Sequence, residues 1–188
     1  MAERLTRPLL FFGIKHCGKS TLGRLTAEHF GVKFVDTDLE LESRFQMLNG
    51  CPLPTRDIFR ELGEEGFRRF EAETVEALAA QQAGPRVVAL GGGVPANPFV
   101  EPEVLKKMGF GVYLAIRPEI AFERVRRRGL PPFLASFADP YAEFLRMNRQ
   151  REAAYRSYAD LTFPIEREEA ASAVAETLIQ IILTELKP

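Results

Sequence analysis

A glycine-rich segment near the start of the chain, Gly13-Ile-Lys-His-Cys-Gly-Lys-Ser-Thr21, constrains the fold most, because it fits the pattern G-x-x-x-x-G-K-[ST]. The apolar run Leu9–Phe12 precedes it and helix-forming residues follow from Lys19, which predicts a strand, a tight loop and a helix. Such a loop curls so that its backbone N–H groups point at phosphate oxygens, and the helix N-terminus adds positive charge. We therefore expect a nucleoside triphosphate at this loop.

The residues of this loop have expected partners. Lys19 would reach the β- and γ-phosphates, and the Ser20 hydroxyl would hold Mg²⁺. The other residues expected to contact the nucleotide are Gly13, His16, Cys17, Gly18 and Thr21. Cys17 is tolerated as a small side chain, and no thiol chemistry is expected of it. An ordinary glycine-rich turn between a strand and a helix is the alternative interpretation.

Length and composition favour one globular domain over residues 1–188, since 188 residues with 46% hydrophobic and 27% charged residues suit one full core. A net charge of −1 argues against general attraction to nucleic acid or anionic membranes. The first residues lack the apolar core of a signal peptide, and no apolar run approaches the length of a membrane span. The two cysteines form no metal or disulfide pattern. We expect a cytoplasmic monomer.

Short apolar segments alternate with longer amphipathic segments along the chain. The sequence predicts strands at 9–12, 32–35, 86–90, 110–116 and 161–165, and helices at 19–30, 39–45, 118–128, 141–158 and 170–186. The stretch from Thr55, a candidate cap, to about Gln82 is rich in helix formers but is expected to break near Gly63 and Gly66. This alternation predicts an α/β fold with a mainly parallel sheet and helices on both faces.

Three chemically suggestive clusters follow the first three predicted strands: the phosphate loop, Asp36-Thr-Asp38 and Gly91-Gly-Gly93. Ligands bind beyond the carboxyl ends of parallel strands, so these clusters should meet at one edge of the sheet. In an extended chain the two aspartates would lie about 6.5 to 7 Å apart at their Cα atoms, one serving Mg²⁺ and the other a hydroxyl group. Helix capping is the alternative role of these aspartates. The triple glycine lets backbone approach a ligand closely, or only forms a tight turn.

Together these residues resemble the shikimate kinase family. The resemblance covers roughly residues 9 to 158 and rests on Gly18–Arg24, Phe34–Asp38, Ile58-Phe59, Gly63-Glu-Glu-Gly-Phe-Arg68 with Glu71, and Gly91–Gly93. It implies a three-layer P-loop kinase fold with a five-stranded parallel sheet and a mobile lid at about residues 129–140. It also implies that ATP, with Mg²⁺, phosphorylates the 3-hydroxyl of shikimate in aromatic amino-acid biosynthesis.

The resemblance assigns catalytic and metal-binding roles to four residues. Asp38 would orient or deprotonate the attacking hydroxyl, and Lys19 would neutralise the γ-phosphate. Asp36 would hold Mg²⁺ through water, beside Ser20. Positioning and charge stabilisation would then supply most of the catalysis.

The resemblance also assigns binding roles. Arg68 and Arg151 would grip the substrate carboxylate, a task suited to a planar bidentate guanidinium. Arg124 would lie against the adenine. Backbone contacts to the substrate would come from Gly91, Gly92 and Gly93.

The chain departs from the family's pattern in three places. Pro131 stands where the lid has an arginine that contacts the ATP phosphates, and Leu90 stands where threonine is preferred. The segment Asn49–Thr55 lengthens the path to the substrate-binding arginine. Candidates to replace the lid charge are Arg126, Arg127, Arg128, Arg146 and Arg149.

Two alternative functions stay open at this point. One is a kinase of another small hydroxy acid such as gluconate, because two arginines favour a carboxylate without identifying its ring. The other is a nucleotide-binding relative that no longer catalyses, motivated by Pro131.

Overall fold

The computed structural model describes residues 5–81 and 84–186 and places five strands in one parallel sheet, in the order β2-β3-β1-β4-β5. The strands are β1 (Leu9–Phe12), β2 (Lys33–Asp36), β3 (Arg86–Ala89), β4 (Phe110–Ile116) and β5 (Leu161–Ile165). The predicted five-stranded parallel sheet is confirmed. Parallel pairing of β1 with both β3 and β4 places the carboxyl ends of the central strands at one edge.

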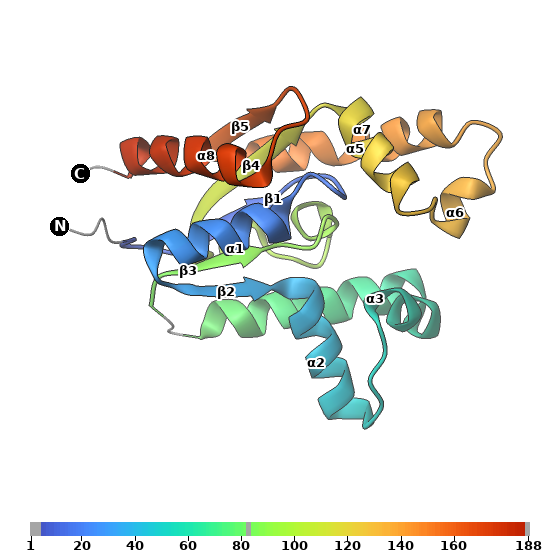
Figure 1. Ribbon diagram of the computed structural model, residues 1–188. Helices are drawn as coiled ribbons and strands as arrows, with labels where there is room; N and C mark the ends of the chain where they lie inside the picture. The colour runs from blue at the N-terminus through green and yellow to red at the C-terminus, as the bar shows by residue number, and fades with distance from the viewer. Residues whose placement is uncertain (1–4, 82–83, 187–188) are drawn as a thin grey trace.

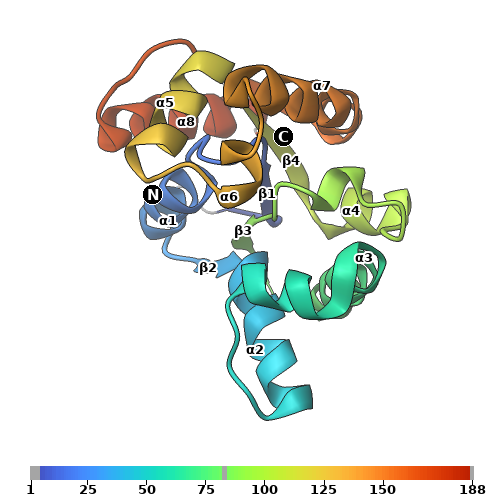
Figure 2. The ribbon, with the colours of Figure 1, turned by 90° about the vertical axis from the view of Figure 1, so that its right-hand side faces the viewer.

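The helices are α1 (Lys19–Phe30), α2 (Thr37–Asn49), α3 (Thr55–Ala80), α4 (Pro102–Met108), α5 (Pro118–Arg127), α6 (Pro132–Ala135), α7 (Pro140–Tyr158) and α8 (Ala171–Glu185), with a 3₁₀ turn η1 (Val94–Ala96). Helices α1 and α8 lie side by side over one face of the sheet, and α3, α4 and α7 cover the other (Figures 1 and 2). The three-layer arrangement therefore agrees with the predicted fold. Within the described residues, no helix is long and apolar enough to cross a lipid bilayer.

The central strands are apolar runs, apart from Arg86 at the start of β3, as expected of parallel strands that are covered on both faces. Every residue of β1 and of β3 is buried, whereas the outer strand β5 alternates between exposed and buried residues and the outer strand β2 exposes Lys33. The main core gathers around Leu9, Phe11, Val87 and Leu114, which are fully buried. This rigid centre carries the loops at the carboxyl edge.

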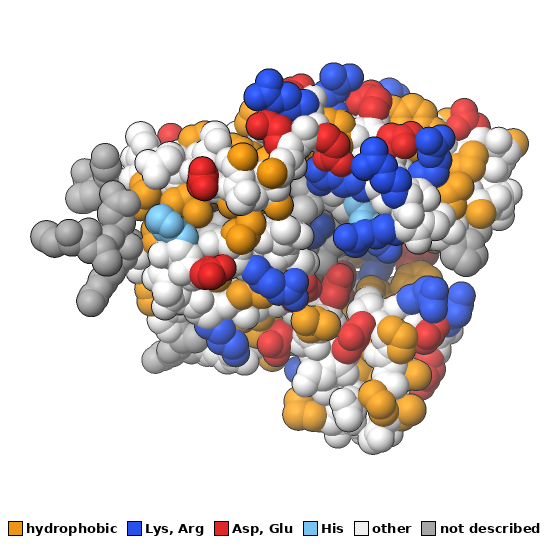
Figure 3. Space-filling view, viewed as in Figure 1, with side chains coloured by type: hydrophobic (Ala, Val, Ile, Leu, Met, Phe, Trp, Pro, Cys, Tyr) orange, Lys and Arg blue, Asp and Glu red, His pale blue; other side chains and the backbone are white. Residues whose placement is uncertain are grey.

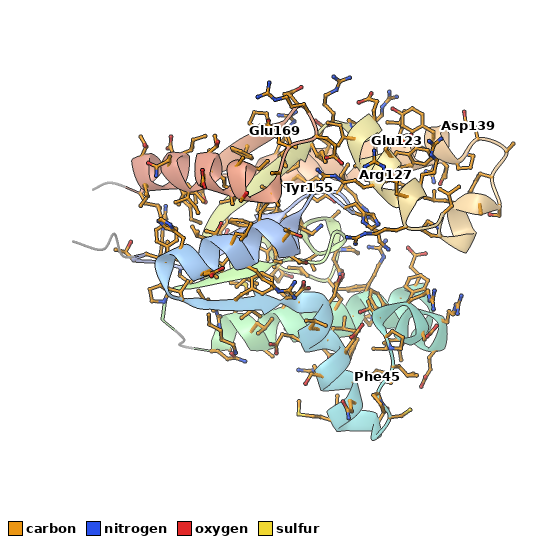
Figure 4. All side chains as sticks on the ribbon, viewed as in Figure 1. Phe45, Glu123, Arg127, Asp139, Tyr155 and Glu169 are labelled. Carbon is orange, nitrogen blue, oxygen red and sulfur yellow. The ribbon has the colours of Figure 1, made fainter. Side chains whose placement is uncertain are left out.

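Helix α2 and the part of α3 that precedes Ala72 form an arm, the α2–α3 arm, around a small cluster of their own, whereas the rest of α3 adds Ala72, Val75 and Leu78 to the main core. Leu41 and Phe45 of α2 meet Ile58 of α3 there, and the Phe45 ring lies edge-on to Phe70 with 5.9 Å between centroids. Figure 1 shows α2 projecting away from the sheet, and Figure 4 labels Phe45 on this arm. The α2–α3 arm thus has an apolar interior of its own.

Several predicted boundaries were wrong. Helix α2 begins at Thr37 instead of residue 39, because Asp36 caps it: the Asp38 N–H donates to Asp36 Oδ1 at 3.2 Å. The extended Asp36–Asp38 geometry is therefore wrong, and the capping interpretation holds for Asp36. Thr55 is the first helical residue of α3 and not its cap, since Pro54 precedes the helix. Elements missing from the prediction are η1, α4 and α6, all of seven residues or fewer.

The expected break in α3 occurs at one glycine only. Gly63 has φ 68° and ψ 177°, a conformation that glycine adopts most readily, whereas Gly66 stays helical. The break falls five residues before Arg68.

Candidate active site

Two adjoining cavities open at the carboxyl edge of the sheet. The larger cavity, of about 600 Å³, is lined by the phosphate loop from Lys15 to Thr21, by the start of α1, by Asp36 and Asp38 and by arginines of α5. The smaller cavity, of about 300 Å³, lies between the α2–α3 arm, the lid and α7. Figure 3 shows basic side chains around the hollow between the arm and the rest of the molecule. The three predicted clusters therefore do meet at one edge.

The predicted loop residues are placed together, with one exception. The larger cavity is lined by His16, Cys17, Gly18, Lys19, Ser20, Thr21 and Arg124, whereas Gly13 lies outside its lining. Gly13 instead has a structural task, because its φ is 146° and a Cβ there would lie 2.7 Å from the Leu114 carbonyl oxygen. The Lys19 Nζ donates to the carbonyl oxygens of Gly13 and Ile14 at 3.1 and 3.2 Å. Phosphate oxygens would draw this ammonium away from its own loop.

Ser20 and Asp36 form a pair of oxygen donors at the mouth of the loop. The Ser20 hydroxyl donates to Asp36 Oδ2 at 2.7 Å. In the described part of the chain, no group of three or more His, Cys, Asp or Glu side chains could hold a metal ion. Mg²⁺ needs no such group, because one or two protein ligands suffice when phosphates and water complete its octahedron. The pair fits a Mg²⁺ ion that arrives with a nucleotide.

Asp38 lies in the first turn of α2, at the boundary between the two cavities, and lines both. Desolvation by the surrounding cleft raises the pKa of Asp38, and the neighbouring Asp36 carboxylate raises it further, while Lys19 and Lys15 oppose the shift. A raised pKa makes this carboxylate a better proton acceptor than a free aspartate. Its position and basicity suit the predicted role of base.

The triple glycine lies against the acidic and basic groups of the site. A Cβ at Gly91 would come 2.8 Å from Asp38 Oδ1, so glycine is required there for the carboxylate to keep its place. A Cβ at Gly92 would lie 3.8 Å from an Arg151 nitrogen. Of the three glycines only Gly93 lines the smaller cavity, and Gly91 and Gly92, for which backbone contacts to the substrate were predicted, lie outside its lining. The buried Tyr155, labelled in Figure 4, donates its hydroxyl to the Gly92 carbonyl at 2.7 Å and fixes this turn against α7.

Arg68 and Arg151 come from different helices and line the same cavity. Arg68 is paired with Glu64 one turn earlier, with 3.0 Å between the nearest nitrogen and oxygen. Because Glu64 is largely exposed, this pair contributes little to stability, and a substrate carboxylate could replace it. Two guanidinium groups on one cavity favour a carboxylate-bearing ligand.

Glu71 is a site residue to which the sequence assigned no role. It is buried one helical turn beyond Arg68, lines the smaller cavity and accepts a hydrogen bond from Asn97 Nδ2 at 2.8 Å. Burial is the main cause that raises the pKa of Glu71, the Asn97 hydrogen bond lowers it, and Asp38 adds to the increase. Its i+3 spacing from Arg68 was the signal available in the sequence.

The five arginines that could supply the charge missing at Pro131 fall into two groups, those that line a cavity and those that do not. Arg127 and Arg128 line the larger cavity, and Figure 4 labels Arg127 on α5. Arg126 is instead paired with Glu123. Arg146 is paired with Glu143, and neither Arg146 nor Arg149 lines either cavity. Pro131 lines the smaller cavity, so the lid meets the acceptor side without a cation at that position.

Arg124 is held in place by two elements. It donates to the His16 carbonyl oxygen at 3.1 Å and forms an ion pair with Glu168. This ties α5 to the phosphate loop and to the loop before α8. The guanidinium thus lies at the wall of the larger cavity, where an adenine contact was predicted.

The other two departures have local consequences. Leu90 is buried, and its N–H donates to the Phe11 carbonyl oxygen at 2.9 Å, so it acts as core beneath the larger cavity. The expected effect of Asn49–Thr55 on the pocket is limited to Thr55, which alone of this segment lines the smaller cavity. Pro52, Leu53 and Pro54 border a separate groove beside α2.

His16 provides a test of the loop's electrostatics. Partial burial and the cations Lys15, Arg128, Lys19 and Arg124 lower the pKa of His16 from 6.5 to about 4. Between these values the unfolded chain binds more protons than the folded chain, so stability is lost as pH falls from 6.5 toward 4.

We therefore expect His16→Asn to lose less stability than the wild type between pH 7 and pH 5, measured as urea midpoints in phosphate-free buffer. Asparagine tolerates the positive φ of 65° at this position. Equal losses in the two proteins would show that His16 titrates normally.

Comparisons with known proteins cover nearly the whole chain. A family model described as shikimate kinase matches residues 15–183. The chain is 34% identical over 187 residues to a shikimate kinase of Rhizobium meliloti, covering 97% of this chain and 91% of that protein. It is 38% identical over 178 residues to a shikimate kinase of Thermobifida fusca, covering 92% and 96%. A solved shikimate kinase of Acinetobacter baumannii in complex with shikimate superposes with a TM-score of 0.81 at 29% identity, covering 98% and 97%.

Proposed function

The chain belongs to the shikimate kinase family, and we propose that it transfers the γ-phosphoryl group of ATP to the 3-hydroxyl of shikimate where its two cavities meet. Members of this family are ATP-dependent kinases, and so is this chain. The observation that supports the site assignment best is the position of Asp38, whose carboxylate lines both cavities. ATP would occupy the larger cavity and shikimate the smaller one.

Positioning of the two substrates accounts for most of the mechanism. Arg68 and Arg151 hold the substrate carboxylate, which turns the acceptor hydroxyl toward Asp38. The backbone of Gly93 borders the substrate on the sheet side. The phosphate loop N–H groups and Lys19 hold the donor phosphates, and Arg124 holds the adenine end. Both reacting atoms are thereby brought to the junction of the cavities.

The chemical step is a direct phosphoryl transfer. The acceptor oxygen forms a bond to the γ-phosphorus as the bond from that phosphorus to the β,γ-bridging oxygen breaks. The electron pair of the broken bond stays on ADP, and the hydroxyl proton passes to Asp38. The raised pKa of Asp38 favours this proton transfer.

Ser20 and Asp36 are the residues we assign to Mg²⁺, Asp36 through water. When bound with ATP, the ion supplies positive charge to the β- and γ-phosphate oxygens. The hydrogen bond between the two side chains keeps both oxygens at the loop before the nucleotide arrives.

We also propose that the chain acts as a single-domain monomer in the cytoplasm, on two substrates that are small molecules. The gluconate and non-catalytic alternatives are less well supported, because the family is that of shikimate kinases and the acceptor cavity retains Asp38, Arg68 and Arg151.

The test is a measurement of ADP release from Mg-ATP with shikimate, beside a no-acceptor control and gluconate. We expect ADP release that depends on shikimate and stays at the control level with gluconate. Turnover with gluconate alone would indicate a changed acceptor. ATP binding by a folded protein without turnover of either acceptor would identify a non-catalytic relative.

A further inference from the structure

Lys15 occupies a position that no other basic residue of the described chain shares. It lies in the phosphate loop between Ile14 and His16, at a place that the loop pattern leaves unspecified. Among the described residues, only Lys15 and Asp38 line both the larger and the smaller cavity. The loop therefore places a cation beside the proposed base, where the phosphoryl group must pass.

The Lys15 side chain is exposed and uncommitted. In residues 5–81 and 84–186, no hydrogen bond or ion pair engages its ammonium group, whereas Lys19 donates to two carbonyl oxygens of the loop. The Lys15 backbone lies beside the triple glycine, since its nitrogen is 4.0 Å from where a Cβ on Gly92 would be. The ammonium group is therefore free to turn toward a ligand, while the Lys15 backbone stays in the phosphate loop.

The other cations near the larger cavity are worse placed for the transferred group. Arg124 is ion-paired with Glu168, and Arg127 lies 3.7 Å from the same carboxylate. Arg128 lines the larger cavity only. These arginines can meet the donor phosphates but do not border the acceptor side. The lid position that would close over the transfer point holds Pro131.

Resting on the function proposed above, we propose that Lys15 is a second catalytic lysine, which contacts the phosphoryl group during its transfer and replaces the charge that Pro131 lacks. The transferring group spreads negative charge over its equatorial oxygens. A compact ammonium on a flexible stem can follow those oxygens from the donor to the acceptor. Contact that strengthens in the transition state raises kcat and leaves ATP affinity nearly unchanged.

The experiment compares Lys15→Gln, Lys15→Arg and the control Lys33→Gln with the wild type. Lys33 is exposed at the start of β2, at the opposite edge of the sheet, and lines neither cavity. We expect Lys15→Gln to lower kcat about 30-fold, the loss of one charge-assisted hydrogen bond, with an ATP Kd within about threefold of wild type. Lys15→Arg should recover most of the lost kcat, and Lys33→Gln should match the wild type.

Each other outcome overturns the proposal. Wild-type kcat in a folded Lys15→Gln variant would show that Lys15 makes no contact in the transition state. Equal losses in kcat and ATP affinity for Lys15→Gln and Lys15→Arg would show that the residue only shapes the loop. If wild-type protein turns over no acceptor, the proposed function fails and takes this proposal with it. Normal wild-type turnover with an unimpaired Lys15→Gln overturns the Lys15 proposal alone.

Discussion

Replacement of Asp38 by asparagine is expected to lower kcat by about 10²- to 10⁴-fold, the usual contribution of a positioned base. Asparagine keeps the shape of the side chain beside Gly91 and still orients a hydroxyl, but it cannot take the proton. The phosphate loop is unchanged, so the ATP Kd should stay within about twofold of wild type. Steady-state kinetics with saturating shikimate, combined with calorimetric titration of ATP, measure both quantities.

Asp57→Asn is the matched control for this variant. Asp57 lies in the first turn of α3, is paired with Arg60 and lines neither cavity. It should leave kcat unchanged. An Asp38→Asn enzyme with wild-type kcat would remove Asp38 from the role of base, whatever its effect on the shikimate KM.

Replacement of Arg151 by leucine is expected to raise the KM for shikimate by about 10²-fold, since hydrogen bonds to a charged group contribute about 1.5 to 3 kcal/mol each. The buried Tyr155 and Gly92 keep their own hydrogen bond in this variant, so the turn should persist. ATP affinity should not change, because Arg151 lines only the smaller cavity. Initial rates over a wide range of shikimate concentration provide the measurement.

An uncharged acceptor distinguishes carboxylate binding from a structural role of Arg151. With the carboxamide analogue of shikimate, wild type and Arg151→Leu should have similar, low kcat/KM values, as a double-mutant cycle requires. Arg156→Leu serves as control, because Arg156 lies on the same helix, is exposed and pairs with Glu152. If Arg151→Leu weakens both acceptors equally, Arg151 supports the fold and does not bind the carboxylate.

The sheet could be predicted from sequence because its central strands are apolar runs, interrupted only by Arg86 at the start of β3, which local pattern identifies. The geometry at Asp36 and Asp38 could not, since a side-chain cap decided where α2 begins. The side-chain cap decides whether Thr37 and Asp38 are extended or helical, and a pattern of two residues is too short to predict which backbone they adopt.

Helical spacing could have predicted which arginines near the end of α5 face the larger cavity. Arg124, Arg127 and Arg128 stand at i, i+3 and i+4, which share one face, and these are the arginines that line the larger cavity. Arg126 falls off this face and is paired with Glu123. The position of Lys15 needed the tertiary structure, because only the approach of the arm and the lid to the loop makes the second cavity.

The α2–α3 arm has a consequence for how acceptor choice can change. Asp38, Arg68 and Glu71 all stand on the arm, whose interior of Leu41, Phe45 and Ile58 is separate from the main core. The added segment runs from the outer end of α2 back to Thr55, whose hydroxyl donates to the Asp38 carbonyl oxygen at 3.5 Å and which lines the smaller cavity. Substitutions and insertions in the arm can therefore alter which hydroxyl is presented while the ATP-holding half keeps its stability. The arm is thus the exchangeable half of the acceptor cavity, whose other half comes from the lid and from α7 with Arg151.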